Sequence, residues 1–229
     1  MNSFQARLIG MFSGFPTRHF PPEIASRLRT ALPVRRSLVF VSAWPDDAAR
    51  NDEDAAGMHG MFVECGMSFG RFAVIDERTP SDKALRMLRE ADCVFLMGGN
   101  PTAQMQFIRQ LNLAEPLRDF GGVLLGVSAG SINMARRALD VWESPKPYEG
   151  LGLTGITIKS HVNKGEDALL EKLRAISAAE KLPICAMADE SAIFLTREGA
   201  DWLGRIRYIE DGVVMPLTQE MLERLNQAE

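Results

Sequence analysis

Short apolar runs recur along the first 127 residues, and each is separated from the next by a stretch with helical periodicity. The apolar runs predict strands at residues 8–12, 37–42, 72–75, 93–97 and 123–125. The stretches between them predict helices at residues 22–32, 51–69, 80–91, 101–111 and 117–120. Apolar strands that alternate with helices are typical of a parallel sheet covered on both faces. The pattern therefore predicts an α/β fold with a mostly parallel sheet and helices on both faces.

The pattern is less regular after residue 137, where a proline-rich loop at 141–147 is expected to line a cleft. A strand at 156–158 and an amphipathic helix around 169–176 follow. Four further strands are predicted at residues 184–187, 192–196, 202–208 and 212–215, before a terminal helix from Thr218. Because no repeat, linker or low-complexity segment interrupts the chain, residues 1–229 are predicted to form one domain that ends in a β-hairpin.

The composition favours a globular protein with a small substrate. Hydrophobic residues make up 46% of the chain and charged residues 24%, and the net charge of −4 gives no bias toward nucleic acid or an anionic membrane. No apolar run approaches the roughly 20 residues that span a bilayer, and Met1–Arg7 lacks the features of a secretory signal. The three cysteines have no metal-ligand spacing and are expected to be reduced thiols in a cytoplasmic protein. Neither a metal nor a cofactor is predicted, and a homodimer stays open.

The most informative motif is Gly126-Val127-Ser128-Ala129-Gly130, which follows a predicted strand and precedes a predicted helix at 131–137. A serine at such a turn matches the G-x-S-x-G nucleophile elbow, in which the serine is exposed above a sheet at the positive end of a helix. The pentapeptide alone also fits a glycine-rich helix start. The motif therefore predicts a nucleophile only if a base and an acid accompany it.

His161 is the favoured base among the three histidines. It follows a predicted strand, and ligand sites of open parallel sheets lie at the strand ends that also present Ser128. The alternatives are His19, which lies in a predicted loop, and His59, which lies in a predicted helix. Both positions are more typical of surface or packing histidines.

Asp189 is the favoured acid, because a carboxylate must orient the imidazole and this one directly follows a predicted strand. Glu190 is its neighbour, and adjacent residues of an extended segment point to opposite sides, so at most one of the two can face His161. Asp140 and Glu143 are the competing acids.

The oxyanion of an acyl transfer needs two backbone donors. The N–H of Ala129, directly after the serine, is one candidate, and the glycine turn at Gly98-Gly99 supplies the other. The alternative for that turn is a tight bend before a capped helix or a phosphate-binding nest.

Two segments, Phe95-Leu96-Met97-Gly98-Gly99-Asn100 and Gly126-Val127-Ser128-Ala129-Gly130-Ser131, occur with a histidine 33 residues after the serine. In this combination the chain resembles the peptidase E (aspartyl dipeptidase) family of serine peptidases, which includes cyanophycinases. The resemblance implies a fold like that of class I glutamine amidotransferases. It implies Ser128 as nucleophile and His161 as base, with oxyanion donors at Gly99 and Ala129.

The resemblance also covers the acid and the substrate-binding segment, with two departures. Matching residues 187–193 to the family's acid segment places Asp189 as the acid, and Glu190 stands where the family has a glycine. The family recognises the substrate's aspartate through an arginine shortly after a segment like 164–166, where this chain has Ala168. Strict aspartyl specificity is therefore not predicted, although Arg174 or Lys172 could substitute.

The predicted function is that of a serine peptidase that hydrolyses short peptides, like a dipeptidase, through an acyl-enzyme. An esterase of the α/β-hydrolase type is one alternative, but that fold needs a histidine near the chain end and none follows His161. A non-catalytic binding module with an amidotransferase-like fold is the other alternative, and the missing arginine and irregular acid segment favour it.

Overall fold

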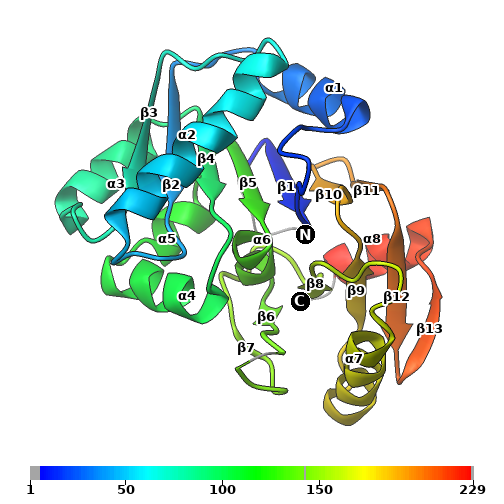
Figure 1. Ribbon diagram of the computed structural model, residues 1–229. Coiled ribbons are helices and arrows are strands. Elements are labelled where there is room, and N and C mark those ends of the chain that lie inside the picture. The colour runs from blue at the N-terminus through cyan, green and yellow to red at the C-terminus, as the bar shows by residue number, and fades with distance from the viewer. Residues whose placement is uncertain (1–5, 142, 228–229) are drawn as a thin grey trace.

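The structure is a computed structural model that describes residues 6–141 and 143–227. Its centre is a sheet whose strands are, in spatial order, β11 (Ala200–Leu203), β10 (Ala192–Leu195), β1 (Leu8–Phe12), β5 (Val123–Val127), β4 (Cys93–Leu96), β2 (Ser37–Val41) and β3 (Arg71–Ile75) (Figure 1). The five strands from β1 to β3 run parallel, whereas β10 and β11 are antiparallel to their neighbours. Residues 1–5 and Trp142, in the loop expected to line a cleft, lie outside the described residues.

Helices cover both faces of this sheet because successive strand residues point to opposite sides. In β2, Leu38 and Phe40 belong to one apolar cluster, and Val39 and Val41 belong to another. The first cluster is completed by helices α1 (Pro22–Ala31) and α2 (Ala48–Glu64). The second is completed by α3 (Ser81–Glu90), α4 (Pro101–Gln110), α5 (Ala114–Arg118), α6 (Ala129–Met134) and α8 (Gln219–Gln227).

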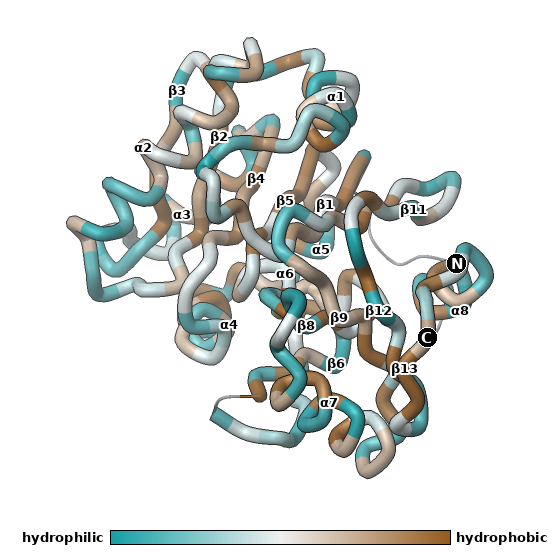
Figure 2. The backbone as a smooth tube through the Cα atoms, turned by 45° about the vertical axis from the view of Figure 1, so that its right-hand side comes forward, coloured by the Kyte–Doolittle hydropathy of each residue, from teal (hydrophilic) through white to brown (hydrophobic). Residues whose placement is uncertain are grey.

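A second, four-stranded sheet lies beside the first. Its strands, in spatial order, are β13 (Val213–Pro216), β12 (Ile206–Glu210), β9 (Ile184–Met187) and β8 (Ile158–Lys159). Helix α7 (Asp167–Glu180) packs its apolar residues on β9 and β12. The short strands β6 (Arg137–Ala138) and β7 (Tyr148–Glu149) form a separate ribbon. Figure 2 shows that hydrophobic residues follow the inner strands, whereas hydrophilic residues gather on the outer turns and loops.

This architecture confirms the predicted α/β class, with a mostly parallel sheet, helices on both faces and a C-terminal hairpin, which is β12–β13. One expectation about the sheet is wrong in detail. The strand before His161, β8, pairs with β9 in the four-stranded sheet and not in the sheet that carries Ser128. Apolar runs alone do not specify which sheet a strand joins, because every buried strand has the same pattern.

Several predicted boundaries also move for local reasons. Helix α3 begins at Ser81 with Pro80 as its N-cap, since the Thr79 hydroxyl donates to the Val74 carbonyl and does not cap the helix. Helix α2 ends at Glu64, five residues before the prediction. The predicted strand at 202–208 is divided between β11 and β12 by Gly204, whose φ of +80° breaks extended backbone.

Candidate active site

Ser128 lies at a strained turn between β5 and α6. Its φ of +48° and ψ of −109° are costly for a residue with a side chain, and such strain persists only where surrounding contacts enforce it. Two glycines provide that enforcement. A Cβ on Gly126 would lie 2.7 Å from the Gly130 carbonyl carbon, and one on Gly130 would lie 2.1 Å from the Leu96 oxygen. Strands β5 and β4 therefore approach the start of α6 closely enough to hold Ser128 at the carboxyl edge of the sheet.

The neighbouring strand fixes the elbow by hydrogen bonds. The Ser128 N–H donates to the Phe12 oxygen at 2.9 Å, and the buried Ser131 hydroxyl lies 2.6 Å from the Gly126 oxygen. The Phe12 N–H donates to the Ser131 hydroxyl at 2.9 Å. Helix α6 is consequently bonded to β1 as well as to β5, so the backbone that carries the Ser128 hydroxyl is held in place.

His161 and Ser128 are brought together although they belong to different sheets. The Nε2 atom of His161 lies 2.9 Å from the Ser128 hydroxyl oxygen, and Nδ1 lies 2.7 Å from Oδ1 of Asp189. Both distances are within hydrogen-bonding range. The His161 backbone has a φ of +63°, and its N–H donates to the Ser13 hydroxyl at 2.8 Å.

Asp189 faces His161 and its neighbour Glu190 does not. The Asp189 N–H donates to Oδ1 of Asn163 at 2.9 Å, and Nδ2 of Asn163 donates back to Oδ2 of Asp189 at 2.8 Å. Glu190 instead accepts a hydrogen bond from the Thr17 hydroxyl at 3.1 Å. The φ of Glu190 is +62°, a conformation that glycine adopts more easily, which accounts for the glycine at this place in the peptidase E family.

The competing histidines and acids lie elsewhere. Nδ1 of His19 is 2.7 Å from Glu64 at the end of α2, and the His59 ring stacks on Phe72 at 4.5 Å. Glu143 accepts a hydrogen bond from Asn100 at 3.1 Å.

Asp140, the remaining competing acid, is buried near Lys159. Burial lowers the pKa of the Lys159 ammonium, and the Asp140 carboxylate opposes that shift. The structure thus brings neither of the alternative acids to the position that Asp189 takes beside His161.

Sequence reasoning missed three residues that support this arrangement: Ser13, Gly14 and Asn163. Gly14 packs directly against the imidazole, since a Cβ there would lie 2.5 Å from Cε1 of His161 and 2.6 Å from Oδ1 of Asp189. The buried Ser13 hydroxyl donates to the Met187 oxygen at 3.1 Å and so links the two sheets. A signal was available, because Ser13-Gly14 directly follows the strand that neighbours β5, at the edge where Ser128 emerges.

Gly99 follows β4, the strand beside β5, and Ala129 directly follows Ser128. Within residues 6–141 and 143–227, neither N–H donates a hydrogen bond. Gly99 has a φ of +142°, and a Cβ there would lie 2.3 Å from Nε1 of Trp44. Two unused donors at a fixed turn are what a developing oxyanion requires.

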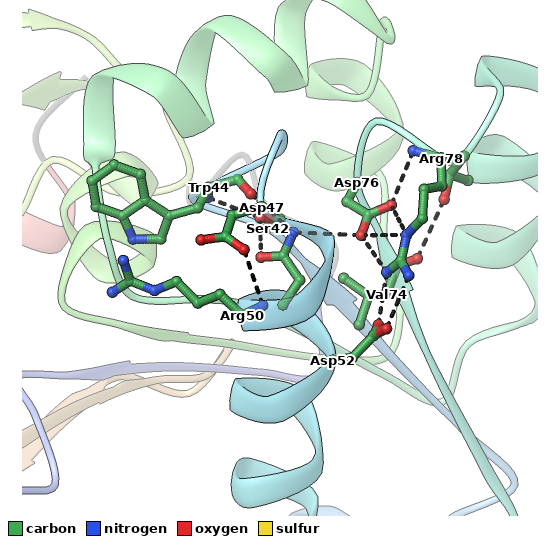
Figure 3. Close-up of polar contacts among 10 residues, drawn as sticks. Ser42, Trp44, Asp47, Arg50, Asp52, Val74, Asp76 and Arg78 are labelled. Carbon is green, nitrogen blue, oxygen red and sulfur yellow. Dashed lines mark hydrogen bonds and ion pairs between the residues drawn. The ribbon is translucent and has the colours of Figure 1, made fainter.

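A polar network holds the loop that carries Trp44 (Figure 3). The Trp44 N–H donates to the Ser42 hydroxyl at 2.8 Å, and Nδ2 of Asn51 donates to the Trp44 oxygen at 2.9 Å. Behind them, the buried Asp76 carboxylate accepts from Nη2 of Arg78 at 2.6 Å and from Nδ2 of Asn51 at 3.4 Å. The carboxyl ends of β2 and β3 are thereby joined to α2, and Trp44 is held against Gly99.

The alternatives for substrate recognition on α7 are occupied. Arg174 donates to the Gly212 oxygen at 2.8 Å and pairs with Glu171, and Lys172 donates to the Val141 oxygen. Both side chains therefore have partners within the chain. Among the residues that the structure describes, no group of three or more His, Cys, Asp or Glu side chains is placed to hold a metal ion.

Comparison with known families identifies the family of this chain. The sequence profile of peptidase family S51 matches residues 30–203, a segment that includes Ser128, His161 and Asp189. The chain belongs to peptidase family S51. Over the described residues, no helix has the length and apolar character needed to cross a membrane.

Two curated relatives share parts of the sequence. A probable alpha-aspartyl dipeptidase of Drosophila melanogaster is 28% identical over 134 residues, which are 51% of this chain and 55% of that protein. A pyridoxal 5'-phosphate synthase subunit, PdxT, of Deinococcus radiodurans is 39% identical over 69 residues, which are 29% of this chain and 35% of that protein. The chain therefore spans about a third to about half of the length of these relatives.

Two solved structures share the fold. A peptidase from an acI-B1 Actinobacterium superposes with a TM-score of 0.68 at 16% identity, covering 92% of this chain and 93% of that one. A peptidase E candidate from Listeria monocytogenes EGD-e gives a TM-score of 0.63 at 13% identity, covering 86% and 98%. At such identities the likeness concerns the fold alone.

Proposed function

We propose that this member of family S51 is a serine peptidase that cleaves short peptides through an acyl-enzyme on Ser128. The observation that carries the proposal is the continuous chain of contacts from the Ser128 hydroxyl through His161 to Asp189, next to two unused backbone donors. The family match and the dipeptidase relative support the same activity.

In the acylation step, Nε2 of His161 takes the proton of the Ser128 hydroxyl as the oxygen attacks the substrate carbonyl. The negative charge that develops on the carbonyl oxygen is stabilised by the N–H groups of Gly99 and Ala129. His161 then gives its proton to the leaving amine, and the peptide C–N bond breaks. Asp189 accepts from Nδ1 throughout, which selects the tautomer with a basic Nε2 and stabilises the imidazolium.

In the deacylation step, His161 removes a proton from water as the water oxygen attacks the ester on Ser128. Collapse of the intermediate breaks the bond to the serine oxygen, which recovers its proton from His161. The first product is the amine, the second is the free carboxylic acid, and the enzyme returns to its starting state.

The chain order Ser128, His161, Asp189 supports this reading over an α/β-hydrolase esterase, in which the acid precedes the histidine. The substrate class proposed is a short peptide without a requirement for aspartate, because Arg174 and Lys172 are engaged elsewhere. Three free cysteines support a cytoplasmic location as part of the same proposal.

Substitution of the nucleophile tests the mechanism. Ser128→Ala and His161→Gln are each expected to lower kcat for a cleaved dipeptide by roughly 10³-fold or more, and the double variant by about the same factor, because the residues act as a unit. A fluorophosphonate probe should add its mass to Ser128 in the wild type and in neither variant. Peptide hydrolysis that survives in purified Ser128→Ala protein would rule the mechanism out.

A further inference from the structure

A cavity of about 270 Å³ lies between α2 and the carboxyl ends of β2 and β4. Three phenylalanine and three methionine side chains line it: Phe15, Phe40, Met58, Met61, Phe95 and Met97. Ligand pockets for drug-sized molecules begin at about 300 Å³, so this cavity has the size for one side chain of a substrate. We propose that it is the pocket for the residue whose carbonyl is attacked by Ser128, and that it selects a large apolar side chain. This inference rests on the proposed function.

The cavity is continuous with the catalytic turn. Two further lining residues are Gly98 and Val127, the chain neighbours of Gly99 and Ser128. A Cβ on Gly98 would lie 3.5 Å from Cγ1 of Val127 and 3.7 Å from Cβ of Ser128. The turns that carry the Gly99 amide and Ser128 therefore each follow directly on a residue of the cavity wall.

The position of the imidazole decides which half of the substrate enters the cavity. The leaving amine receives its proton from Nε2 of His161, so the amine half of the peptide must face that ring. His161 packs on Gly14 and Asp189, and none of these three residues lines the cavity. The side chain in the cavity consequently belongs to the acyl half, which stays on Ser128 after the amine leaves.

The chemistry of the wall favours an apolar occupant. Phe40, Phe95, Met61 and Met97 are buried and offer no ionic partner. A carboxylate would lose its hydration there without compensation, whereas burial of a hydrocarbon side chain is favourable. Methionine side chains adapt to different shapes, so the pocket should accept phenylalanine, leucine and methionine rather than one of them alone.

The charged residues that line the cavity are balanced in sign, so they give no preference for a substrate with an acidic side chain. The exposed residues Arg18, Arg50, Glu53 and Asp54 contribute two charges of each sign. Arg50 is 3.5 Å from Asp54 and stacks over the Trp44 ring at 4.7 Å. A substrate aspartate would thus meet as much repulsion as attraction on its way in.

A panel of dipeptides that end in leucine tests the specificity. The first residue is phenylalanine, leucine, methionine, alanine or aspartate, and kcat/KM is measured for each. We expect the three large apolar residues to exceed alanine and aspartate by at least about tenfold, as single methylene groups already give roughly 10- to 200-fold in apolar pockets. Equal or higher values for alanine or aspartate would overturn the pocket assignment.

Helix α2 offers a matched pair of variants. Gly57 stands at the centre of the α2 face that lines the cavity, and a Cβ there meets nothing within 4 Å. Gly57→Leu should fill the cavity and lower the phenylalanine-to-alanine ratio of kcat/KM at least tenfold. Gly60→Leu is the same change one turn further on, outside the lining and also with open space, and should leave the ratio unchanged. Leucine has a higher helix propensity than glycine, so both variants should fold.

The outcomes separate the pocket from the mechanism. If the fluorophosphonate probe labels Ser128 but Gly57→Leu leaves the ratio unchanged, or Gly60→Leu shifts it equally, the pocket assignment is wrong and the peptidase mechanism stands. If Ser128 is not labelled and no dipeptide of the panel is cleaved, the proposed function fails, and the pocket assignment fails with it.

Discussion

The two sheets contribute different parts of the candidate site, and they hold those parts by different means. The seven-stranded sheet carries Ser128 and Gly99, which are fixed by backbone conformation and by the close approach of glycines. The four-stranded sheet carries His161 and Asp189; the His161 N–H donates to the Ser13 hydroxyl, and Asp189 accepts from the Asn163 side chain. The nucleophile half therefore depends mainly on backbone conformation, whereas the acid–base half depends on a few specific polar contacts and on the close approach of Gly14.

Gly99→Ala gives the largest expected effect on the nucleophile half. A Cβ at this φ of +142° would meet Nε1 of Trp44 at 2.3 Å, so the turn must move and the amide no longer points at the oxyanion. Loss of one such donor lowers kcat by roughly 10²- to 10³-fold. Steady-state kinetics on a cleaved dipeptide measure this loss.

Gly66→Ala is the matched control for that change. Gly66 also has a positive φ, +72°, but a Cβ there meets nothing within 4 Å. Both variants should lose thermal stability through backbone strain, and only Gly99→Ala should lose turnover. Equal kcat in the two variants would mean that the Gly99 amide plays no part in catalysis.

Asp76→Ala tests how much the polar network behind Trp44 stabilises the nucleophile half of the site. The Asp76 side chain is 1% exposed and accepts hydrogen bonds from Arg78 and Asn51 (Figure 3). Its removal should lower the free energy of unfolding by about 2–3 kcal/mol, because buried donors lose their acceptor. Urea denaturation measures the change.

Glu90→Ala provides the comparison for Asp76. Glu90 pairs with Arg71 on the surface, where the two side chains are 60% and 64% exposed, so its loss should cost no more than about 1 kcal/mol. If the two variants were equally stable, the network would contribute nothing beyond an ordinary surface ion pair.

The same contrast explains how much the sequence could predict. The elbow at Ser128 and the glycine turn at Gly99 were recognisable because their residues are contiguous and their conformations demand glycine. The predicted bounds of β1 and β9 equal the observed bounds, since the apolar runs of these strands have sharp ends. Local chemistry thus sufficed for the nucleophile half of the fold.

The acid–base half could not be predicted to the same depth. The choice between Asp189 and Glu190 depends on backbone that turns left-handed at Glu190, and Asn163 acts only because β8 and β9 are parallel neighbours. The hydrophobic periodicity of the sequence does not indicate that β8 pairs with β9. The role of Ser13 as a link between the sheets likewise follows from a contact across 148 positions of the chain, to the His161 N–H.

Asn163→Asp is expected to have a moderate effect on the acid–base half. The substitution replaces the Nδ2 donor with a carboxylate oxygen 2.8 Å from Oδ2 of Asp189. The added negative charge favours the protonated imidazole, so the acidic limb of the pH dependence of kcat/KM should move to higher pH. We expect roughly tenfold lower kcat/KM near neutral pH, about the loss of one charged hydrogen bond.

The same chemical change on the surface separates positioning from a general effect of charge. Asn112 is exposed and has a φ of +56°, which aspartate tolerates. Asn112→Asp should leave the pH profile in place. A profile that moves in both variants, or in neither, would contradict a positioning role for Asn163.

The smallest expected effect lies at the opposite edge of the seven-stranded sheet, where Asp92 precedes β4. Its carboxylate accepts from the Arg36 guanidinium at 2.7 Å and from the Ser37 N–H at 3.2 Å, and the Arg36 hydrogen bond is the main reason that the pKa of Asp92 is lowered from 3.8. Because the folded-state pKa is the lower one, the stabilisation is present above about pH 4 and is lost as the pH falls through the folded value. Asp92→Asn should therefore be less stable than wild type at pH 7, by less than about 1 kcal/mol because solvent screens the exposed guanidinium.

The stability difference between wild type and Asp92→Asn should narrow as the pH falls below about 4, because the wild-type carboxyl then becomes protonated. Urea denaturation at a series of pH values from 7 downward measures it. Turnover at pH 7 should not change, because parallel strands present Ser128 at their carboxyl ends and Asp92 at their amino ends. A stability difference that does not narrow as the pH falls would show that packing of the side chain, and not its charge, stabilises this part of the sheet. Reduced turnover would show that the two edges of the sheet are coupled.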